Sequence, residues 1–297
     1  MKITVVIVTF NGAFWIEKNI KSILKSNYSV AIIVVDNNSD DRTLLILEQF
    51  SDIEIIKSNH NLGFGKANNL GIQKALQNGS DAVFLLNQDT WIFENTISNL
   101  VHSWIQNQNF GILSPLHYSN DTQTLDANFE NYYNKKYKTN TNIAAVPFVN
   151  AAAWLISKKC LEKVGGFEPI FSHYGEDRNF CNRVLYHKFD IGIVENSKII
   201  HDRIIFRNFS KDNLQARFII LNSLLNINNT VLKGIFIGFK SVFGLSKYFF
   251  KYYNLKKTVS LFFNLFFNFV LMLFHLILIL KIRKNAILGI SGIPKNQ

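Results

Sequence analysis

Residues 3–39 read ITVVIVTFNGAFWIEKNIKSILKSNYSVAIIVVDNNS, and this stretch decides the fold. Two short runs rich in Val and Ile, at 3–9 and 31–36, enclose a stretch with helical character at 14–26. Each run is apolar at consecutive rather than alternate positions, which is typical of strands that helices cover on both faces. The stretch therefore predicts a strand, a helix and a second strand parallel to the first.

The same alternation of strand and helix continues along the first 115 residues and predicts an α/β fold with a mostly parallel central sheet. Residues 119–142 are rich in Asn, Tyr and Lys without a clear period, so we expect a variable loop there. The other expected elements are a helix at 41–50, a strand at 53–58, a helix at 66–78, a strand at 82–87, a strand within 144–157, a helix that opens within 174–184, and short strands at 191–194 and 199–200.

Polar residues follow three of the predicted strands, in the clusters Thr9-Phe10-Asn11, Asp36-Asn37-Asn38-Ser39 and Asn87-Gln88-Asp89. The carboxyl ends of parallel strands lie at one edge of a sheet, and ligands of such sheets bind outside that edge. Asn, Asp, Ser and Thr are also common in turns and helix caps, so a purely structural role stays open for each cluster. The sequence predicts a ligand site at this edge.

The net charge of +11 is distributed unevenly along the chain. Residues 1–212 contain 21 Lys and Arg and all 21 Asp and Glu, whereas eleven further Lys and Arg lie after Asp212. A basic segment rich in Phe, Leu and Ile fits an anionic membrane surface, which attracts each nearby Lys or Arg by about 1 kcal/mol. Nucleic acid is disfavoured as a partner because it would leave the apolar runs unused. We expect an α/β domain at 1–212 and a helical, membrane-associating segment at 213–297.

The longest apolar stretch, residues 258–280, has 23 residues, which is long enough to span a bilayer. Basic residues flank both ends of it, so the charge distribution gives a single span no preferred orientation. A narrow polar stripe also runs along the helical wheel, formed by Lys257, Asn264, Asn268 and His275. We favour a peripheral or monotopic helix in the membrane interface over a span.

The expected compartment is the cytoplasm. Cys160 and Cys181 are too few for a disulfide framework and fit a reducing environment. The apolar run at 3–8 is too short for the apolar core of a signal peptide. We therefore expect the α/β domain on the cytoplasmic side of the membrane.

Five motifs follow one another along residues 1–205: VVIVTFN at 5–11, VVDNNS at 34–39, NLGFGKANNLG at 61–71, LLNQD at 85–89 and YGED at 174–177. In this order they resemble the family 2 glycosyltransferases, and within them the bacterial rhamnosyltransferase-like branch. The resemblance implies the GT-A fold and transfer of a sugar from a nucleotide diphosphate with inversion at the anomeric carbon. The third motif also looks like a dinucleotide fingerprint, but Asn68 replaces its last glycine and it follows the third strand, which disfavours a nicotinamide site.

The resemblance implies that the donor nucleotide is bound by Thr9, Asn11, Asp36, Asn38, Asn61, Lys66 and Asn87. In this scheme Asp36 accepts a hydrogen bond from the imide N–H of uracil or thymine. Asn87 stands where the family has the first Asp of an Asp-x-Asp motif. The resemblance further implies a Mg²⁺ or Mn²⁺ ion on the diphosphate, held by Asp89 and His201. A helix cap at Asp89 and a structural role for His201 stay open.

The YGED motif implies Asp177 as the general base that takes the proton of the acceptor hydroxyl, with Glu176 bonding the acceptor or orienting the loop. Acidic residues at a helix start also stabilise that helix, so a purely structural role stays open for both residues. The pocket for the donor sugar and acceptor is expected to include Asn150, Trp154 and His173. Trp154 could stack on a sugar face. The alternative is that its strand simply packs densely against a helix.

Together these assignments predict a metal-dependent, inverting glycosyltransferase that moves rhamnose or a similar sugar from a dTDP- or UDP-sugar to a lipid-linked oligosaccharide. The expected place is the cytoplasmic face of the bacterial inner membrane, in surface polysaccharide (O-antigen or capsule) biosynthesis. Because Asn87 replaces an Asp, the alternative is a non-catalytic, membrane-associated nucleotide-sugar-binding or scaffold protein. A processive synthase is disfavoured because the sequence has neither several clear spans nor a Gln-x-x-Arg-Trp element.

Overall fold

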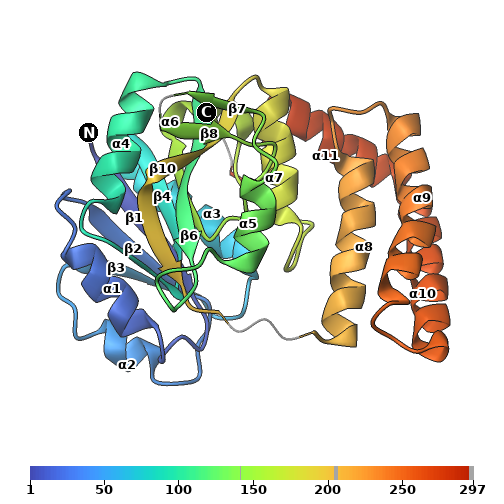
Figure 1. Cartoon of the computed structure of the whole chain (residues 1–297), viewed down its shortest axis with the longest axis horizontal. Coiled ribbons are helices and arrows are strands. Elements are labelled where there is room, and N and C mark those ends of the chain that lie inside the picture. The colour runs from blue at the N-terminus through green and yellow to red at the C-terminus, as the bar shows by residue number, and fades with distance from the viewer. Residues whose placement is uncertain (141, 204–206, 294–297) are drawn as a thin grey trace.

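The computed structural model of the chain describes residues 1–140, 142–203 and 207–293 (Figure 1). Within them one sheet holds ten strands in the order β3-β2-β1-β4-β9-β6-β10-β8-β7, with β5 paired to β10. The strands are β1 (Ile3–Thr9), β2 (Ala31–Asp36), β3 (Ile53–Lys57), β4 (Ala82–Asn87), β5 (Thr90–Ile92), β6 (Phe110–Tyr118), β7 (Lys138–Asn140), β8 (Ile143–Ala145), β9 (Ala153–Ser157) and β10 (Asp190–His201).

The sheet is parallel from β3 through β2 and β1 to β4, and again between β6 and β10. Strand β9 runs antiparallel between β4 and β6. The helices of the α/β part are α1 (Ile16–Leu24), α2 (Thr43–Leu47), α3 (Phe64–Gln77), α4 (Thr96–Gln106), α5 (Ala127–Tyr133), α6 (Lys158–Val164) and α7 (Glu176–Tyr186). The predicted α/β fold is confirmed.

Helices cover both faces of the sheet, and this cover explains why the strands are apolar at consecutive positions. In β1, Val6 contributes to one buried cluster, whereas Val5 and Ile7 contribute to the other, because successive side chains of a strand point to opposite faces. The first cluster includes side chains from α3, α5, α6 and α7, and the second includes side chains from α1, α2 and α4.

The expectation of a loop at 119–142 is wrong in part, because α5 and β7 lie within it. The carboxylate of Asp126 accepts hydrogen bonds from the backbone N–H groups of Asn128 and Phe129 and so caps α5. Phe129 is fully buried. Helix α5, with one cap and one buried ring, is too short to give a periodic signal in the sequence. Residue 141 lies outside the described residues.

The two short strands expected at 191–194 and 199–200 are one strand, β10. Its pairing with β6 shifts between Val194 and Lys198, where the ladder contains a bulge or irregularity. Polar residues at this interruption break the apolar run, which is why the sequence suggests two strands rather than one.

Four C-terminal helices pack beside the α/β part: α8 (Phe209–Leu225), α9 (Val231–Phe249), α10 (Leu255–Phe274) and α11 (Leu276–Leu288) (Figure 1). They enclose a third buried cluster, which includes Ile220, Leu265 and Ile279. The residues after α11 return to the α/β part, where Ser291 forms a bridge with Gly165 and Asn69 donates to the carbonyl of Gly292. The boundary expected after Asp212 falls in the first turn of α8.

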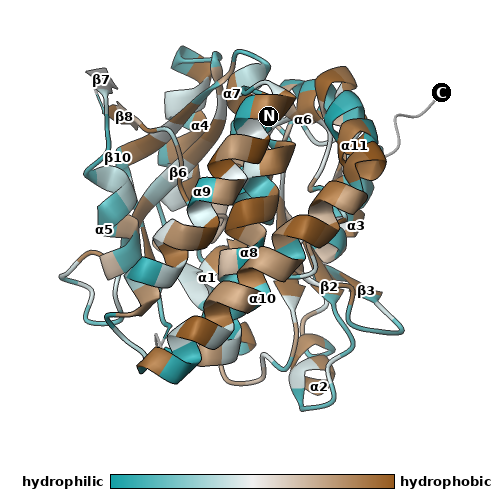
Figure 2. Cartoon of the chain, turned by 90° about the vertical axis from the view of Figure 1, so that its right-hand side faces the viewer, coloured by the Kyte–Doolittle hydropathy of each residue, from teal (hydrophilic) through white to brown (hydrophobic). Residues whose placement is uncertain are grey.

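The apolar stretch at 258–280 is not one continuous helix, because α10 ends at Phe274 and α11 begins after His275. Among the described residues, α10 is the one helix that is long and apolar enough to cross a membrane by length and composition. It buries only one narrow side, formed by Thr258, Leu261, Leu265 and Phe269. Figure 2 faces these helices and shows a surface rich in hydrophobic residues on α9, α10 and α11.

Candidate active site

A cleft of about 440 Å³ opens at the sheet edge where β1 and β4 end. Its walls come from the strand ends, from the loop before α3, and from the loop before α7. The lining residues are Val8, Phe10, Asn37, Asn61, Gly63, Phe64, Asn87, Gln88, Asp89, Ser172 and His173. The structure thus brings together residues from all three of the clusters that follow β1, β2 and β4, although the cluster after β1 contributes only Phe10 to the cleft wall.

Hydrogen bonds tie the chain after β1 to its neighbouring strand ends. Thr9 is buried, and its hydroxyl donates to Gln88 Oε1 at 2.7 Å, an oxygen that also accepts from the N–H of Phe10. Asn11 is exposed with φ 49°, and its backbone N–H donates to Ser39 Oγ at 3.0 Å. Gln88 therefore holds the chain in place where β1 ends. Its position in the LLNQD motif did not suggest this role.

Asp36 is 1% exposed at the end of β2. Its Oδ2 accepts the N–H of Ser39 at 3.2 Å, whereas its buried Oδ1 has no partner among the described residues. A buried carboxylate oxygen without a donor is costly, so this atom is suited to a ligand N–H. Asn38, two residues on, is exposed and has φ 69°.

The loop before α3 is organised by Asn37, which the sequence interpretation did not single out. Asn37 is buried; its Nδ2 donates to Asn61 Oδ1 at 2.9 Å and its Oδ1 accepts the N–H of Leu62. Gly63 has φ +79°, and a Cβ there would lie 2.0 Å from the carbonyl oxygen of Ser172. This close approach requires glycine. Lys66 is exposed in the first turn of α3 and is not part of the described cleft wall.

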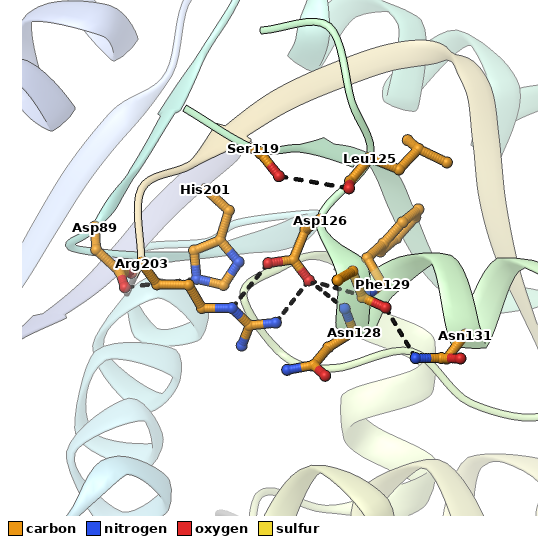
Figure 3. Close-up of polar contacts among 10 residues, drawn as sticks. Asp89, Ser119, Leu125, Asp126, Asn128, Phe129, Asn131, His201 and Arg203 are labelled. Atoms are coloured by element: carbon orange, nitrogen blue, oxygen red, sulfur yellow. Dashed lines mark hydrogen bonds and ion pairs between the residues drawn. The ribbon is translucent and has the colours of Figure 1, made fainter. Parts of the chain in front are cut away.

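Asp89 and His201 meet because β5 pairs with the end of β10, where Thr90 lies opposite His201. Asp89 Oδ2 lies 3.5 Å from His201 Nε2 (Figure 3). The histidine is 3% exposed, and its Nδ1 has no partner among the described residues. Asn87 lines the cleft with a half-buried side chain.

The donor set at this position fits a Mg²⁺ or Mn²⁺ ion that is completed by a ligand. The described residues contain no group of three or more His, Cys, Asp or Glu side chains that could hold a metal by themselves. One carboxylate with one imidazole leaves most positions of an octahedral ion for phosphate oxygens and water, which is how Mg²⁺ is commonly bound beside a diphosphate.

An ion pair behind His201 holds the end of β10 in place, and no motif in the sequence predicted it. Arg203 donates to both carboxylate oxygens of Asp126, at 2.9 and 2.7 Å (Figure 3). Burial alone would raise the pKa of Asp126, but the Arg203 guanidinium and the helix N–H groups outweigh it and lower this pKa. His117 stacks on Phe129 and meets His201 edge-on.

Two carboxylates begin α7. Glu176 is 5% exposed, its Oε2 has no partner among the described residues, and burial, with the charge of Asp177 adding to it, raises its pKa to about 7. Asp177 is half-buried and accepts the N–H of Arg178 at 2.6 Å. Burial raises the pKa of Asp177, and the N–H and charge of Arg178 oppose this effect.

The loop before α7 connects two clefts. Ser172 and His173 line the cleft at the sheet edge, whereas the next residues, from Tyr174 to Arg178, line a second cleft of about 670 Å³. Tyr174 has φ 72° and Gly175 has φ +89°. This left-handed pair turns the chain sharply, so that successive residues of one loop face the two clefts.

Trp154 does not reach either cleft, and its expected stacking on a sugar is wrong. It lies on β9, in the middle of the sheet, with 0% exposure. Its ring stacks on Phe167 at 6.1 Å between centroids and also contacts Phe180. The dense packing that the sequence left open is the observed arrangement. Asn150 is half-buried with an unpartnered Oδ1, and it is not part of either described cleft wall.

Comparisons with known proteins identify the family of the chain. The model of the family described as Glycosyl transferase family 2 matches residues 4–165. The low-salt glycan biosynthesis hexosyltransferase Agl10 of Haloferax volcanii is 24% identical over 247 residues, covering 78% of each chain. The dTDP-rhamnosyl transferase RfbF of Shigella flexneri is 25% identical over 211 residues, which is 66% of this chain and 67% of that protein.

Solved structures share the fold. A crystal structure of S. aureus TarS, residues 1–349, matches with a TM-score of 0.65 and 16% identity over 91% of this chain and 80% of that one. The mannosyltransferase PcManGT of Pyrobaculum calidifontis, in complex with GDP-Man and Mn²⁺, matches with a TM-score of 0.59 and 13% identity over 96% of this chain and 86% of that one. These likenesses confirm the expected GT-A fold.

Proposed function

The chain belongs to glycosyl transferase family 2 and is a glycosyltransferase, and we propose that it moves a sugar from a dTDP- or UDP-sugar to a lipid-linked glycan. The observation that carries this proposal is the pairing of Asp89 with His201 beside a cleft formed by strand ends. Rhamnose or a similar hexose is the proposed sugar, in line with the relative named as a dTDP-rhamnosyl transferase.

The proposed donor site has the base at Asp36 and the diphosphate at Asp89 and His201. The unpartnered Oδ1 of Asp36 would accept the imide N–H of uracil or thymine. Asp89 and His201 would hold Mg²⁺ or Mn²⁺, which supplies positive charge that stabilises the departing diphosphate. Thr9, Asn11 and Asn61 shape this site through the contacts that join the strand ends. Asn87 lines the cleft, and Asn38 is exposed in the loop after Asp36.

The proposed chemistry at the acceptor belongs to the α7 carboxylates. Asp177 takes the proton of the acceptor hydroxyl while that oxygen attacks the anomeric carbon from the face opposite the diphosphate, which inverts the configuration. Glu176, beside it, bonds the acceptor. His173 lies in the loop between donor and acceptor clefts, where it can contact the transferred sugar.

Replacing Asp36 by Ala tests the proposed base site. Loss of a hydrogen bond to a carboxylate costs about 1.5–3 kcal/mol, so we expect the affinity for UDP and dTDP to fall by about 10- to 100-fold. The affinity for CDP, which presents an acceptor at the same ring position, should already be low in the wild type and change little. Isothermal titration in the presence of Mn²⁺ measures both. Equal binding of UDP and CDP by the wild type would contradict the assignment.

We further propose that the segment at 213–297 attaches the catalytic domain, 1–212, to the cytoplasmic face of the bacterial inner membrane, with α10 lying in the interface. Large side chains project from α9, α10 and α11: Phe236 is 66% exposed, Phe263 63%, Phe267 61%, Phe274 80% and Ile277 85%. Lysines accompany them without any acidic residue after Asp212. An apolar surface with a basic border is complementary to an anionic bilayer.

Vesicle binding tests this attachment. We expect the protein to sediment with vesicles of equal parts phosphatidylcholine and phosphatidylglycerol, less so at high salt, because screening weakens the lysine contribution. The double variant Phe263→Asp, Phe267→Asp should stay in the supernatant. Leu45→Asp, a change at a 64% exposed residue on α2, is the matched control and should bind like the wild type. Unchanged binding of the double variant contradicts the proposed surface. Retention after an alkaline carbonate wash would favour a span.

The alternative of a non-catalytic nucleotide-sugar-binding or scaffold protein is favoured by one observation, the replacement of an acidic residue by Asn87. Such a protein would bind a nucleoside diphosphate without turnover. If the protein shows no turnover, the proposed role in surface polysaccharide (O-antigen or capsule) biosynthesis is also wrong.

A further inference from the structure

The second cleft, of about 670 Å³, lies between α7 and the C-terminal helices α8 and α9. One side of α8 forms much of its wall, through Gln215, Ile219 and Asn222. These residues are three or four positions apart and therefore lie on one face of the helix. The opposite face of α8 is buried in the C-terminal cluster, through Ile220 and Leu224 among others. Packing thus fixes the orientation of the wall.

Two buried oxygen atoms of cleft residues have no hydrogen-bond donor among the described residues. Asn222 is 6% exposed; its Nδ2 donates to the carbonyl of Gly175 at 2.9 Å, while its Oδ1 has no partner among the described residues. Glu176 Oε2 is likewise buried without a hydrogen-bond partner among the described residues. The two atoms come from the consecutive helices α7 and α8. The amide oxygen of Asn222 can only accept a hydrogen bond, and the carboxyl of Glu176 accepts when it is ionised. Leaving such atoms unsatisfied costs about 1–3 kcal/mol each.

The chemistry of the cleft selects a neutral ligand rich in hydroxyl groups. Two carboxylates, those of Glu176 and Asp177, line the cleft beside one guanidinium, that of Arg178, so it has no excess of positive charge that would attract phosphate. The side-chain amide of Gln215 can both donate and accept, as neighbouring sugar hydroxyls require. Tyr174 and Tyr132 supply ring surfaces against which a sugar face can pack, whereas the ring of Phe148 is buried under the guanidinium of Arg178.

We propose that this cleft binds the terminal sugar of the acceptor glycan, and that Asn222 on α8 determines acceptor specificity by accepting a hydrogen bond from one of its hydroxyls. The inference rests on the proposed function. Asn222 lies outside residues 4–165, which match the family model, so the proposal makes acceptor choice depend on the C-terminal helices. Ile219 and Ile237 line the cleft on α8 and α9 and give it an apolar part on the side of the proposed membrane surface.

The test uses octyl β-D-glucopyranoside, octyl β-D-galactopyranoside, octyl α-L-rhamnopyranoside and octyl β-N-acetylglucosaminide as acceptors, with donor hydrolysis measured in parallel. Asn222→Leu removes the free oxygen, so we expect the KM for the best glycoside to rise about 10-fold, with donor hydrolysis within about 2-fold of the wild type. Asn222→Asp keeps an accepting oxygen and should keep that KM within about 3-fold. Ser223→Ala is the control, because its hydroxyl already donates to the carbonyl of Ile219.

A purely structural role of Asn222, in holding Gly175, would give a different pattern. Both Asn222 variants would then lower donor hydrolysis and transfer together, with the acceptor KM unchanged, and that outcome overturns the proposal. A wild type that hydrolyses donor but neither glycosylates nor binds any of the four glycosides, as read by saturation-transfer NMR, also overturns it. Absence of donor hydrolysis by the wild type is a separate result, which counts against the proposed function.

Discussion

Replacing Asp177 by Asn is expected to lower kcat by about 10³-fold, because the acceptor hydroxyl loses the general base that removes its proton. Asn keeps the shape of the side chain and its contact with the N–H of Arg178, so donor binding should change little. Initial-rate measurements with saturating donor and a glycoside acceptor give the change in kcat, and titration with nucleoside diphosphate checks that the donor site is intact.

The pH dependence of the transfer rate is a second test of Asp177 as the general base. Burial raises the pKa of Asp177 above its ordinary value against the opposing effect of Arg178. The base works only when ionised, so the wild-type rate should fall as the pH drops through this raised pKa. Glu176→Gln is the matched control; it removes the neighbouring group with a pKa of about 7 and should cost about 10-fold. A loss in Glu176→Gln as large as in Asp177→Asn would assign the base to Glu176 instead.

Replacing Asp89 by Ala is expected to lower kcat/KM by about 10³-fold, because it removes the carboxylate proposed to hold the metal on the diphosphate. The binding of UDP or dTDP should also lose its dependence on Mn²⁺. Parallel titrations with Mn²⁺ and with EDTA, for the wild type and the variant, measure this dependence.

A structural control separates metal binding from the local fold at Asp89. Arg203 supports the end of β10 from behind His201 without being a proposed ligand. Arg203→Lys keeps the charge beside Asp126 but loses the two-point contact, so we expect a smaller loss than for Asp89→Ala and retained Mn²⁺ dependence. If Asp89→Ala binds nucleotide with the wild-type response to Mn²⁺, the metal assignment is wrong.

The sequence was sufficient for the central sheet because its strands are buried on both faces and therefore read as continuous apolar runs. It failed where the signal is short or depends on distant contacts. Helix α5 rests on one cap, at Asp126, and one buried ring, at Phe129. The break at His275 divides an apolar stretch whose composition does not change there. Trp154 was expected at a sugar because apolar residues beside small ones suit a pocket floor as well as a core.

Four of the predicted site residues, Asn61, Asn87, Asp89 and His173, line the cleft at the sheet edge, but the sequence could not predict the geometry that joins Asp89 to His201. The approach of Asp89 to His201 depends on the antiparallel pairing of β5 with β10, which joins residues more than a hundred positions apart. Asn222 gave no signal at all, because an Asn on an amphipathic helix usually faces water. Its role is apparent only from the structure, in which α8 lies against the loop of Gly175 and Asn222 Oδ1 has no partner among the described residues.

The most direct test of glycosyl transfer is a donor panel read by mass spectrometry. The wild-type protein would be incubated with Mn²⁺, the octyl glycosides and, in turn, UDP-, dTDP- and GDP-sugars. We predict a glycoside whose mass increases by one sugar with at least one UDP- or dTDP-sugar, and no such product with EDTA or in Asp89→Ala. No product and no donor hydrolysis with any donor, or product formation that Asp89→Ala leaves unchanged, would contradict a metal-dependent glycosyltransferase.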